Sequence, residues 1–139
     1  MIHMSGATAA RRLSRSAIAA ATHIPEAYLA KILQLLVKAR LIRSRPGVHG
    51  GFELSRAPSG ISMLEVIEAI DGPSALAACI TDENSCEQSP WCGVRRALSE
   101  AQDAMLRVLR AASVTGLVEQ AVAHHPLPLT RIETAAVTQ

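Results

Sequence analysis

Apolar residues at helical spacing predict two neighbouring helices in the first third of the chain. Residues 14–24, SRSAIAAATHI, predict a short helix with Ser14 as its N-cap and a turn at His23 and Ile24. Pro25 then stands at the first position of the next helix, where no intrahelical donor is lost. The run PEAYLAKILQLLVKAR places apolar residues at steps of three and four, which predicts a helix with a core-facing stripe. The stripe consists of Leu29, Ile32, Leu33, Leu36 and Val37.

The opposite face at the start of this second helix carries short, polar or hydrogen-bonding side chains. Its members are Glu26, Ala27, Tyr28, Lys31 and Gln34. Such side chains at the start of a second helix suit insertion into the major groove of DNA. Plain solvent exposure explains this face equally well when it is taken alone.

A β-hairpin with basic flanks follows the second helix. Residues 41–45 and 51–55 predict two strands, with 46–50 as the turn. Glycines in the turn permit positive φ and let a backbone pass close to a phosphate or into a minor groove. The glycines are Gly47, Gly50 and Gly51, and the basic side chains around them are Arg43, Arg45 and His49. A basic hairpin directly after two helices predicts the wing of a winged helix-turn-helix, and the combination predicts DNA binding.

The second half of the chain predicts a capped helix and then a long amphipathic one. Ser62 and Glu65 have the spacing of a capping box, and Asp71-Gly72-Pro73 ends that helix. Further on, a heptad seam predicts a helix of about 18 residues, with Arg95 among the charged residues that face outward. The seam is Val94, Leu98, Ala101, Met105, Val108 and Ala112. We expect a second copy to cover it, which makes a homodimer; packing within one chain is the alternative. A short last helix should follow, with Thr115 as its cap.

Charge is divided unevenly between the two halves of the 139 residues. Residues 1–56 carry nine Lys/Arg and two Glu, a net +7, whereas residues 57–139 carry five Lys/Arg and ten Asp/Glu, a net −5. This asymmetry points to a polyanionic partner on one side, although an unevenly charged solvated surface would look the same. The composition, 49% apolar and 2% aromatic, favours one domain of tightly packed helices. No membrane span or secretion signal is visible, so we expect a cytoplasmic protein.

All three cysteines lie within 14 residues, as C-x6-C-x5-C, in a polar segment with little reason to form helix or strand. They are Cys79, Cys86 and Cys92. An odd number of thiols argues against a disulfide framework. Three interpretations stay open on spacing alone: an iron–sulfur cluster, a zinc site that lacks a fourth ligand at short spacing, or reduced thiols without a cofactor.

The chain resembles a known family at this point. The run IPEAYLAKILQLLVKARLIRSRPGVHGGFELSR, then ISMLEVIEAIDG and the cysteine loop, is similar to the Rrf-two family of winged-helix regulators, the IscR/NsrR/RirA group. The resemblance covers residues 12–122 and is strongest at the G-x-x-G-G-F wing and the cysteine loop. It implies a mainly α fold with a β-hairpin wing and a long C-terminal dimerisation helix. It also implies a homodimeric, DNA-binding transcriptional regulator or repressor that senses NO, redox or iron status.

The resemblance also implies roles for particular residues. DNA contacts map to Glu26, Ala27, Tyr28, Lys31 and the 46–51 turn, and the ligands of a 2Fe–2S or 4Fe–4S cluster map to Cys79, Cys86 and Cys92. Pro46 stands where many members have an arginine, so Arg45 is one step away from that place. Arg95 stands where IscR-like members have a histidine ligand, which leaves the fourth ligand unassigned.

The expected organisation has four parts: a winged domain at 1–72, the cysteine loop at 73–93, a dimer helix region at 94–123 and a flexible tail at 124–139. The chain begins near the place where the family's first helix ends, so we expect the recorded start to be too late. No catalytic motif is visible, which predicts a protein that is not an enzyme. The rival hypothesis is a cluster-free winged-helix repressor regulated by direct oxidation of its thiols.

Overall fold

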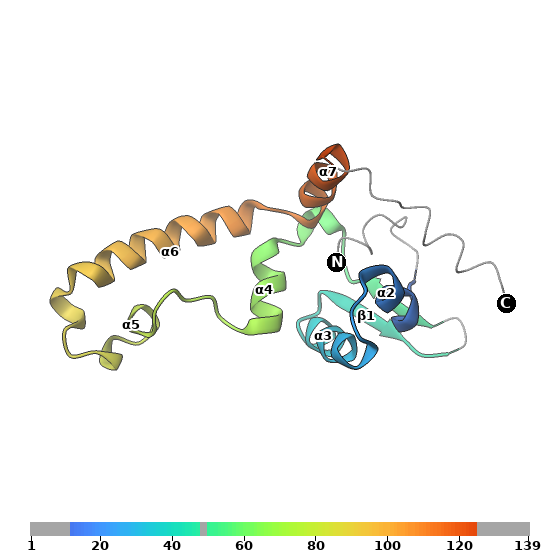
Figure 1. Cartoon of the computed structure of the whole chain (residues 1–139), viewed down its shortest axis with the longest axis horizontal. Helices are drawn as coiled ribbons and strands as arrows, with labels where there is room; N and C mark the ends of the chain where they lie inside the picture. The colour runs from blue at the N-terminus through green and yellow to red at the C-terminus, as the bar shows by residue number, and fades with distance from the viewer. Residues whose placement is uncertain (1–11, 48–49, 125–139) are drawn as a thin grey trace.

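A small winged domain and a long helical arm make up the part of the chain that the computed structural model describes, residues 12–47 and 50–124 (Figure 1). The winged domain contains α2 (Arg15–Thr22), α3 (Glu26–Lys38), β1 (Ile42–Arg45), β2 (Gly51–Leu54), the 3-10 turn η1 (Pro58–Gly60) and α4 (Met63–Asp71). The arm contains α5 (Ala78–Thr81), the 3-10 turns η2 (Glu83–Ser85) and η3 (Ser89–Trp91), and α6 (Gly93–Ala111). The last helix, α7 (Val114–His124), packs against η1. The beginning of the chain, where the family's first helix should end, and the tail beyond His124 lie outside the described residues.

The helix-turn-helix forms as the sequence predicts, with one correction. The side chain of Ser14 caps α2 by accepting a hydrogen bond from the amide of Ala17 at 3.1 Å. His23 makes the turn with φ 56°. Pro25 is the N-cap of α3 rather than its first residue, because its ψ of 134° is extended. Its carbonyl accepts hydrogen bonds from the amides of Tyr28 and Leu29, both at 3.0 Å.

The core lies where the two helices meet the wing and α4. Leu29, Leu33 and Leu36 are buried, and Ile32 and Val37 pack against them, which confirms the predicted stripe. The other buried members are Leu13, Ile18, Leu41, Ile42, Ile61 and Val114. The core therefore joins both ends of the described chain, since its members run from Leu13 near the first described residue to Val114 in the last helix.

The wing is an antiparallel hairpin in which Ile42 pairs with Leu54 and Arg45 with Gly51. Phe52 of β2 also exchanges two backbone hydrogen bonds with Leu13, at 2.9 and 3.0 Å, so β2 lies between β1 and the segment before α2. Gly51 has φ 144°, and a Cβ there would lie 2.7 Å from the carbonyl oxygen of Leu13. Only glycine fits this close approach.

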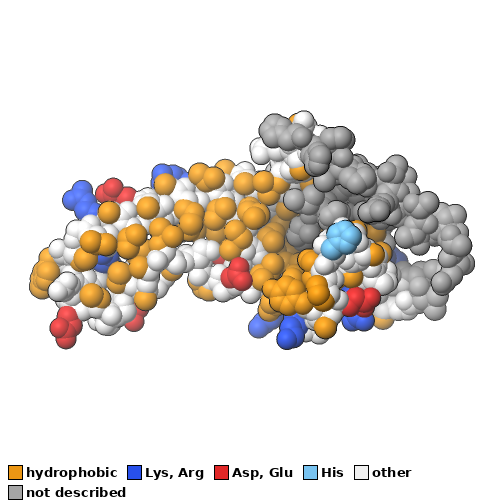
Figure 2. All heavy atoms as spheres, in the orientation of Figure 1, with side chains coloured by type: hydrophobic (Ala, Val, Ile, Leu, Met, Phe, Trp, Pro, Cys, Tyr) orange, Lys and Arg blue, Asp and Glu red, His pale blue; other side chains and the backbone are white. Residues whose placement is uncertain are grey.

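The arm consists mainly of α6, whose 19 residues match the predicted length. The predicted seam is uncovered at three of its six positions: Val94 and Val108 are each 68% exposed and Ala101 is exposed, whereas Leu98, Met105 and Ala112 are partly buried. Figure 2 shows hydrophobic side chains running along this arm. Helix α6 also packs on α4 and α5, and its residues Arg95 and Gln102, next to the seam, bind the segment that contains α5. In residues 12–47 and 50–124, no helix is long and apolar enough to cross a membrane.

The cysteine segment differs from the expectation of an irregular loop. It folds as three single turns, α5, η2 and η3, joined by short links. Single turns are not stable in isolation, because nucleating a helix fixes several residues for one hydrogen bond. Here α5 packs against α6, η2 packs against α5, and η3 packs against η2.

Candidate functional site

The exposed start of α3 is one part of the site. Glu26, Ala27, Tyr28 and Lys31 all lie on the surface, and Tyr28 is 59% exposed. Glu26 accepts a hydrogen bond from Nε of Arg15 at 3.3 Å, which ties the start of α3 to α2. A surface with an exposed tyrosine hydroxyl and an ammonium group on one helical face offers hydrogen-bond donors to base edges and phosphates.

The wing is the second part. Arg43 and Arg45 are exposed on β1, and Gly47 has φ 112° in the turn. Gly50 allows a tight return of the chain, because a Cβ there would lie 2.3 Å from the carbonyl oxygen of Arg45. His49 lies outside the described residues.

Glu53 on β2 organises the arginines of the wing and was missed by sequence reasoning. Its carboxylate accepts from Nε of Arg12 at 3.0 Å and from Nε of Arg45 at 3.4 Å. The hydrogen bond from Arg12, followed by that from Arg45, lowers the pKa of Glu53 against the effect of desolvation. The hairpin register alone would not have found these pairs, since Glu53 stands opposite Arg43, yet its carboxylate binds Arg12 and Arg45.

A basic hollow of about 780 Å³ extends from the C-terminal end of α3 along β1. Its arginines are Arg40, Arg43, Arg45 and Arg56. Arg56 is held by the carboxylate of Glu65, whereas Arg40 and Arg43 make no ion pair within the described part of the chain. The surface around the wing is therefore more basic than the predicted residues alone suggested.

The joint between the winged domain and the arm is a short backbone bridge. The amide of Met63 donates to the carbonyl of Ala112 at 2.8 Å, and the amide of Val114 donates to that of Ile61 at 2.9 Å. The bridge thus pairs Ser62 with Ser113, the residues in front of α4 and α7. Ser113, rather than Thr115, caps α7, since its Oγ accepts from the amide of Gly116 at 3.1 Å.

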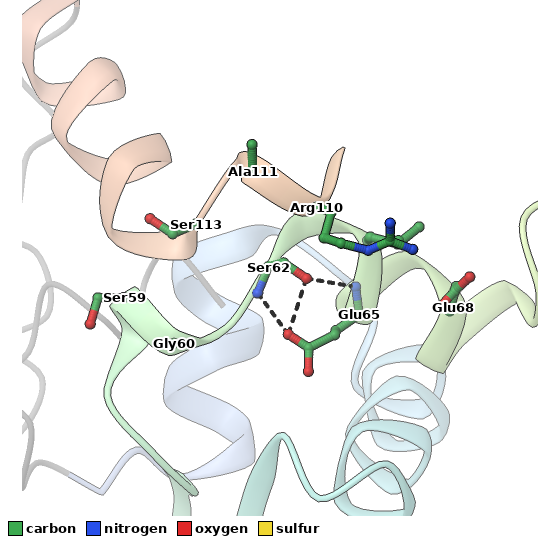
Figure 3. A pocket seen from close by; sticks show the side chains of 9 residues that line it. Ser59, Gly60, Ser62, Glu65, Glu68, Arg110, Ala111 and Ser113 are labelled. Atoms are coloured by element: carbon green, nitrogen blue, oxygen red, sulfur yellow. Dashed lines mark hydrogen bonds between the residues drawn. The ribbon is translucent and has the colours of Figure 1, made fainter. Parts of the chain in front are cut away.

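The predicted capping box of α4 is present at this joint and is drawn in Figure 3. Oε2 of Glu65 accepts from the amide of Ser62 at 2.9 Å, and the amide of Glu65 donates to Oγ of Ser62 at 3.2 Å. A cavity of about 440 Å³ lies beside it, between α4 and the corner where α6 ends. Its polar lining includes Ser59, Glu68, Arg110 and Ser113. The joint is therefore held by backbone and capping hydrogen bonds, and a cavity remains between α4 and the end of α6.

The three thiols form the third part of the site. Cys79 lies in α5 and is half-buried, Cys86 is exposed after η2, and Cys92 is the half-buried N-cap residue of α6. All three are free thiols. Between them, Ser89 is 3% exposed, and its Oγ finds no hydrogen-bond partner in the described structure.

These residues fit an iron–sulfur cluster in kind but are not arranged around one. Three thiolates are the usual ligand type for such clusters. However, within residues 12–47 and 50–124 no group of three or more His, Cys, Asp or Glu side chains is placed so as to hold a metal ion. The segment would have to rearrange to bring the three sulfurs together, and single-turn elements are suited to that.

Arg95 differs from its predicted position. It does not face outward; its side chain is 24% exposed and folds back onto the cysteine loop. Nε donates to the carbonyl of Cys79 at 2.9 Å, and Nη2 donates to Glu83 at 2.6 Å. A signal for this contact was present in the sequence, since an arginine in the first turn of a helix is disfavoured by the helix dipole unless it has a specific partner.

The helix-turn-helix with its hairpin defines a winged-helix DNA-binding protein. The profile of Rrf2, described as an iron-dependent transcriptional regulator, matches residues 1–120. The chain belongs to the Rrf2 family of transcriptional regulators.

Individual relatives agree with this assignment. The regulator NsrR of Geobacillus kaustophilus is 37% identical over 103 residues, which are 73% of this chain and 70% of that protein. The protein aau3 of Rhizobium meliloti is 34% identical over 103 residues, with 73% and 67% covered. Among solved structures, T. potens IscR matches with a TM-score of 0.68 at 19% identity over 99% of this chain and 83% of that one. CymR of B. subtilis matches with a TM-score of 0.65 at 24% identity, over 86% and 87%. The two structures confirm the fold.

Removal of the Glu65 carboxylate tests the joint. The amide of Ser62, together with Arg56, lowers the pKa of Glu65 below its ordinary value of 4.5, against the effect of desolvation. The carboxylate therefore stabilises the fold fully above pH 4.5, and this contribution is lost as the pH falls through the lower native pKa. We expect Glu65→Ala to reduce the free energy of unfolding by about 1 kcal/mol at pH 7, with the difference from wild type shrinking in acid.

Urea unfolding at several pH values measures this effect, and Glu68→Ala is the matched control. Glu68 is exposed one turn further along α4, and no hydrogen bond to its side chain is found in the described structure. Equal destabilisation by both substitutions, or a loss that does not depend on pH, would contradict the role given to Glu65.

Proposed function

We propose that this chain is a homodimeric, DNA-binding repressor. The state of the cysteine loop sets the position of its two winged domains relative to each other. In this proposal residues 1–72 read DNA, 73–93 sense the signal, 94–123 join the two copies, and 124–139 form the tail. The observation that carries it is a continuous connection: the loop is bonded to the start of α6, and the end of α6 is bonded to the winged domain at the Ser62–Ser113 bridge.

DNA contacts come from the start of α3 and from the wing. Tyr28 and Lys31 enter the major groove beside Glu26 and Ala27, and the hairpin at Gly47–Gly50, which includes His49, follows the adjacent backbone. Arg43 and Arg45 supply charge along β1. Support comes from the exposure of these groups and from the basic hollow around them. Because the major contacts are ionic, binding should weaken as salt rises.

The homodimer is supported by the uncovered seam on α6. Val94, Ala101 and Val108 recur along one face and have no partner within the described residues. Burial of a valine side chain is worth about 1.5–3 kcal/mol relative to full exposure. A second copy of the same helix, related by two-fold symmetry, buries the seams of both helices against each other.

Cys79, Cys86 and Cys92 are the proposed ligands of an iron–sulfur cluster. When bound, such a cluster supplies a centre that reacts with NO, with oxidants or with changes in iron supply. The residues of this chain would hold it by their thiolates, and Ser89 lies between two of them with its hydroxyl unpaired. The match to an iron-dependent family and the similarity to NsrR support this cofactor.

A second candidate is regulation by direct thiol oxidation, which the free thiols and the exposure of Cys86 support. In that case two thiols and one peroxide give one disulfide and two water molecules, so the oxidant takes up the two electrons and two protons that the thiols release. Any pair of the three cysteines would close part of the loop.

The Lys31 side chain tests the DNA-contacting face. We expect Lys31→Ala to reduce the slope of log K against log salt by about 1, because one phosphate contact is lost. Fluorescence anisotropy with a promoter duplex at several salt concentrations measures the slope. Lys38→Ala is the matched control, since Lys38 lies in the last turn of the same helix. Equal loss in both variants would mean that general basic attraction, and not the start of α3, governs binding.

Iron and sulfide analysis of protein purified without air tests the cofactor. We expect visible colour in wild type and its loss in Cys86→Ala and Cys92→Ala, with the far-ultraviolet circular dichroism unchanged because neither thiol is in the core. Gln88→Ala is the control in the same loop, since its side chain is exposed and makes no cap hydrogen bond. Colour that persists in both cysteine variants would refute the ligand set, and iron-free wild type would leave direct oxidation as the mechanism.

A further inference from the structure

The guanidinium of Arg95 is bonded to two separate parts of the cysteine loop. It donates from Nε to the carbonyl of Cys79 at 2.9 Å and from Nη2 to the carboxylate of Glu83 at 2.6 Å. Three-quarters of the Arg95 side chain is shielded from solvent, whereas Glu83 is 77% exposed. The exposed ion pair alone contributes little. The bond to the carbonyl is the more informative contact, because its donor is charged and partly buried.

The carbonyl of Cys79 needs an outside donor. It belongs to α5, a helix of four residues, and the last four carbonyls of any helix lack an intrahelical partner. Neighbouring carbonyls are satisfied locally: that of Ala77 accepts from the amide of Ile80, and that of Ala78 accepts from the amide of Asp82. Arg95 therefore supplies the donor for the carbonyl of Cys79 and attaches this single turn to α6.

Gln102 holds the segment just before α5 in the same way. It is 9% exposed, and its Oε1 accepts from the amide of Leu76 at 3.0 Å. Arg95 and Gln102 are seven residues apart, two turns of α6, so they lie on one face of the helix. The two side chains bind the backbone amide of Leu76 and the backbone carbonyl of Cys79, two residues that are three positions apart in the loop.

The later part of the loop has no comparable attachment among the described hydrogen bonds. Its contacts are short-range: the amide of Asn84 donates to Asp82, that of Ser89 to the carbonyl of Cys86, and that of Trp91 to the carbonyl of Gln88. Trp91 is 83% exposed. Residues 84–91 thus form a span between two ends that are both fixed to α6, one through Arg95 and the other through the covalent start of the helix.

We propose that Arg95 is a positioning residue for the thiols: with Gln102 it keeps residues 76–83 attached to α6, so that Cys79 in α5 and Cys92 at the start of α6 hold fixed places relative to each other while Cys86 moves. This inference deepens the proposed function and rests on it, since the proposed function gives the three thiols their sensing role. It assigns to Arg95 a task other than ligation, namely holding the loop in place by hydrogen bonds whether or not anything is bound to the sulfurs.

Hydrogen exchange on the full-length, reduced, iron-free protein tests the attachment, with Arg95→Ala compared with Arg96→Ala. Arg96 is the matched control, since it is the next residue, its side chain is 85% exposed, and it pairs only with Glu100 among the described residues. In Arg95→Ala we expect the amides of Ile80 and Asp82 to exchange about tenfold faster, as α5 opens without its charged donor. The amide of Leu33 in the core should be unchanged in both variants and shows that the protein remains folded.

Alkylation of the thiols by iodoacetamide, followed by mass spectrometry, adds a readout that general loosening of the fold does not reproduce. In wild type, Cys86 should react before Cys79, because Cys86 is exposed and Cys79 is half-buried. Arg95→Ala should raise the rate at Cys79 selectively, and Arg95→Lys should restore it in part, since an ammonium group lacks the fork that reaches two acceptors.

Two results would overturn the inference. One is exchange of Ile80 and Asp82 in Arg95→Ala that equals that in Arg96→Ala, and the other is a Cys79 alkylation rate that is the same in all variants. Both experiments use iron-free protein, so they remain decisive whatever the iron analysis shows. Failure of the cluster proposal would appear as iron-free wild type, whereas failure of this inference would appear only in the Arg95 variants.

Discussion

The uncovered apolar seam on α6 is the constraint on which the arrangement of the molecule depends. Helix α6, 19 residues long, extends from the winged domain with two valines 68% exposed to water. In the proposed dimer, one face of α6 belongs to the partner, and the adjacent face, with Arg95 and Gln102, belongs to the cysteine loop. Any change in the loop then acts on the same helix that sets the two winged domains relative to each other.

The C-terminal end of α6 connects the arm directly to the winged domain. Two backbone hydrogen bonds, from Met63 to Ala112 and from Val114 to Ile61, join the arm to the winged domain, and the fully buried Ile61 anchors them in the core. The cavity beside the joint leaves the corner without tight packing. A switch of this design needs only a small difference in free energy between two orientations of the arm relative to the winged domain. One ligand or one redox change at the loop then favours one orientation over the other.

Local patterns predicted most of the elements. Ser14, the Ser62–Glu65 capping box, the core stripe of α3 and the hairpin were all readable because each depends on neighbours a few residues apart. The family resemblance supplied the fold class, which the Rrf2 match and the two solved structures confirm.

The contacts that organise the site were beyond local patterns. Arg95 and Cys79 are 16 residues apart, Gln102 and Leu76 are 26 apart, and Arg12 and Glu53 are 41 apart. A heptad count leaves Gln102 off the seam and treats Arg95 as solvated charge, since it does not show which loop will fold over the helix. The single turns of the cysteine segment were missed for the same reason: α5 packs against α6, and η2 packs against α5 and η3.

Sedimentation equilibrium of the wild-type protein and of Val108→Glu over a wide range of concentrations tests the central claim most directly. The wild type should sediment with twice the 14.7 kDa mass of the chain, and a carboxylate in the middle of the seam should shift the protein toward that single-chain mass while leaving its helix content unchanged. A wild type that stays at 14.7 kDa at every concentration, or a Val108→Glu variant that dimerises as well as wild type, would contradict the account.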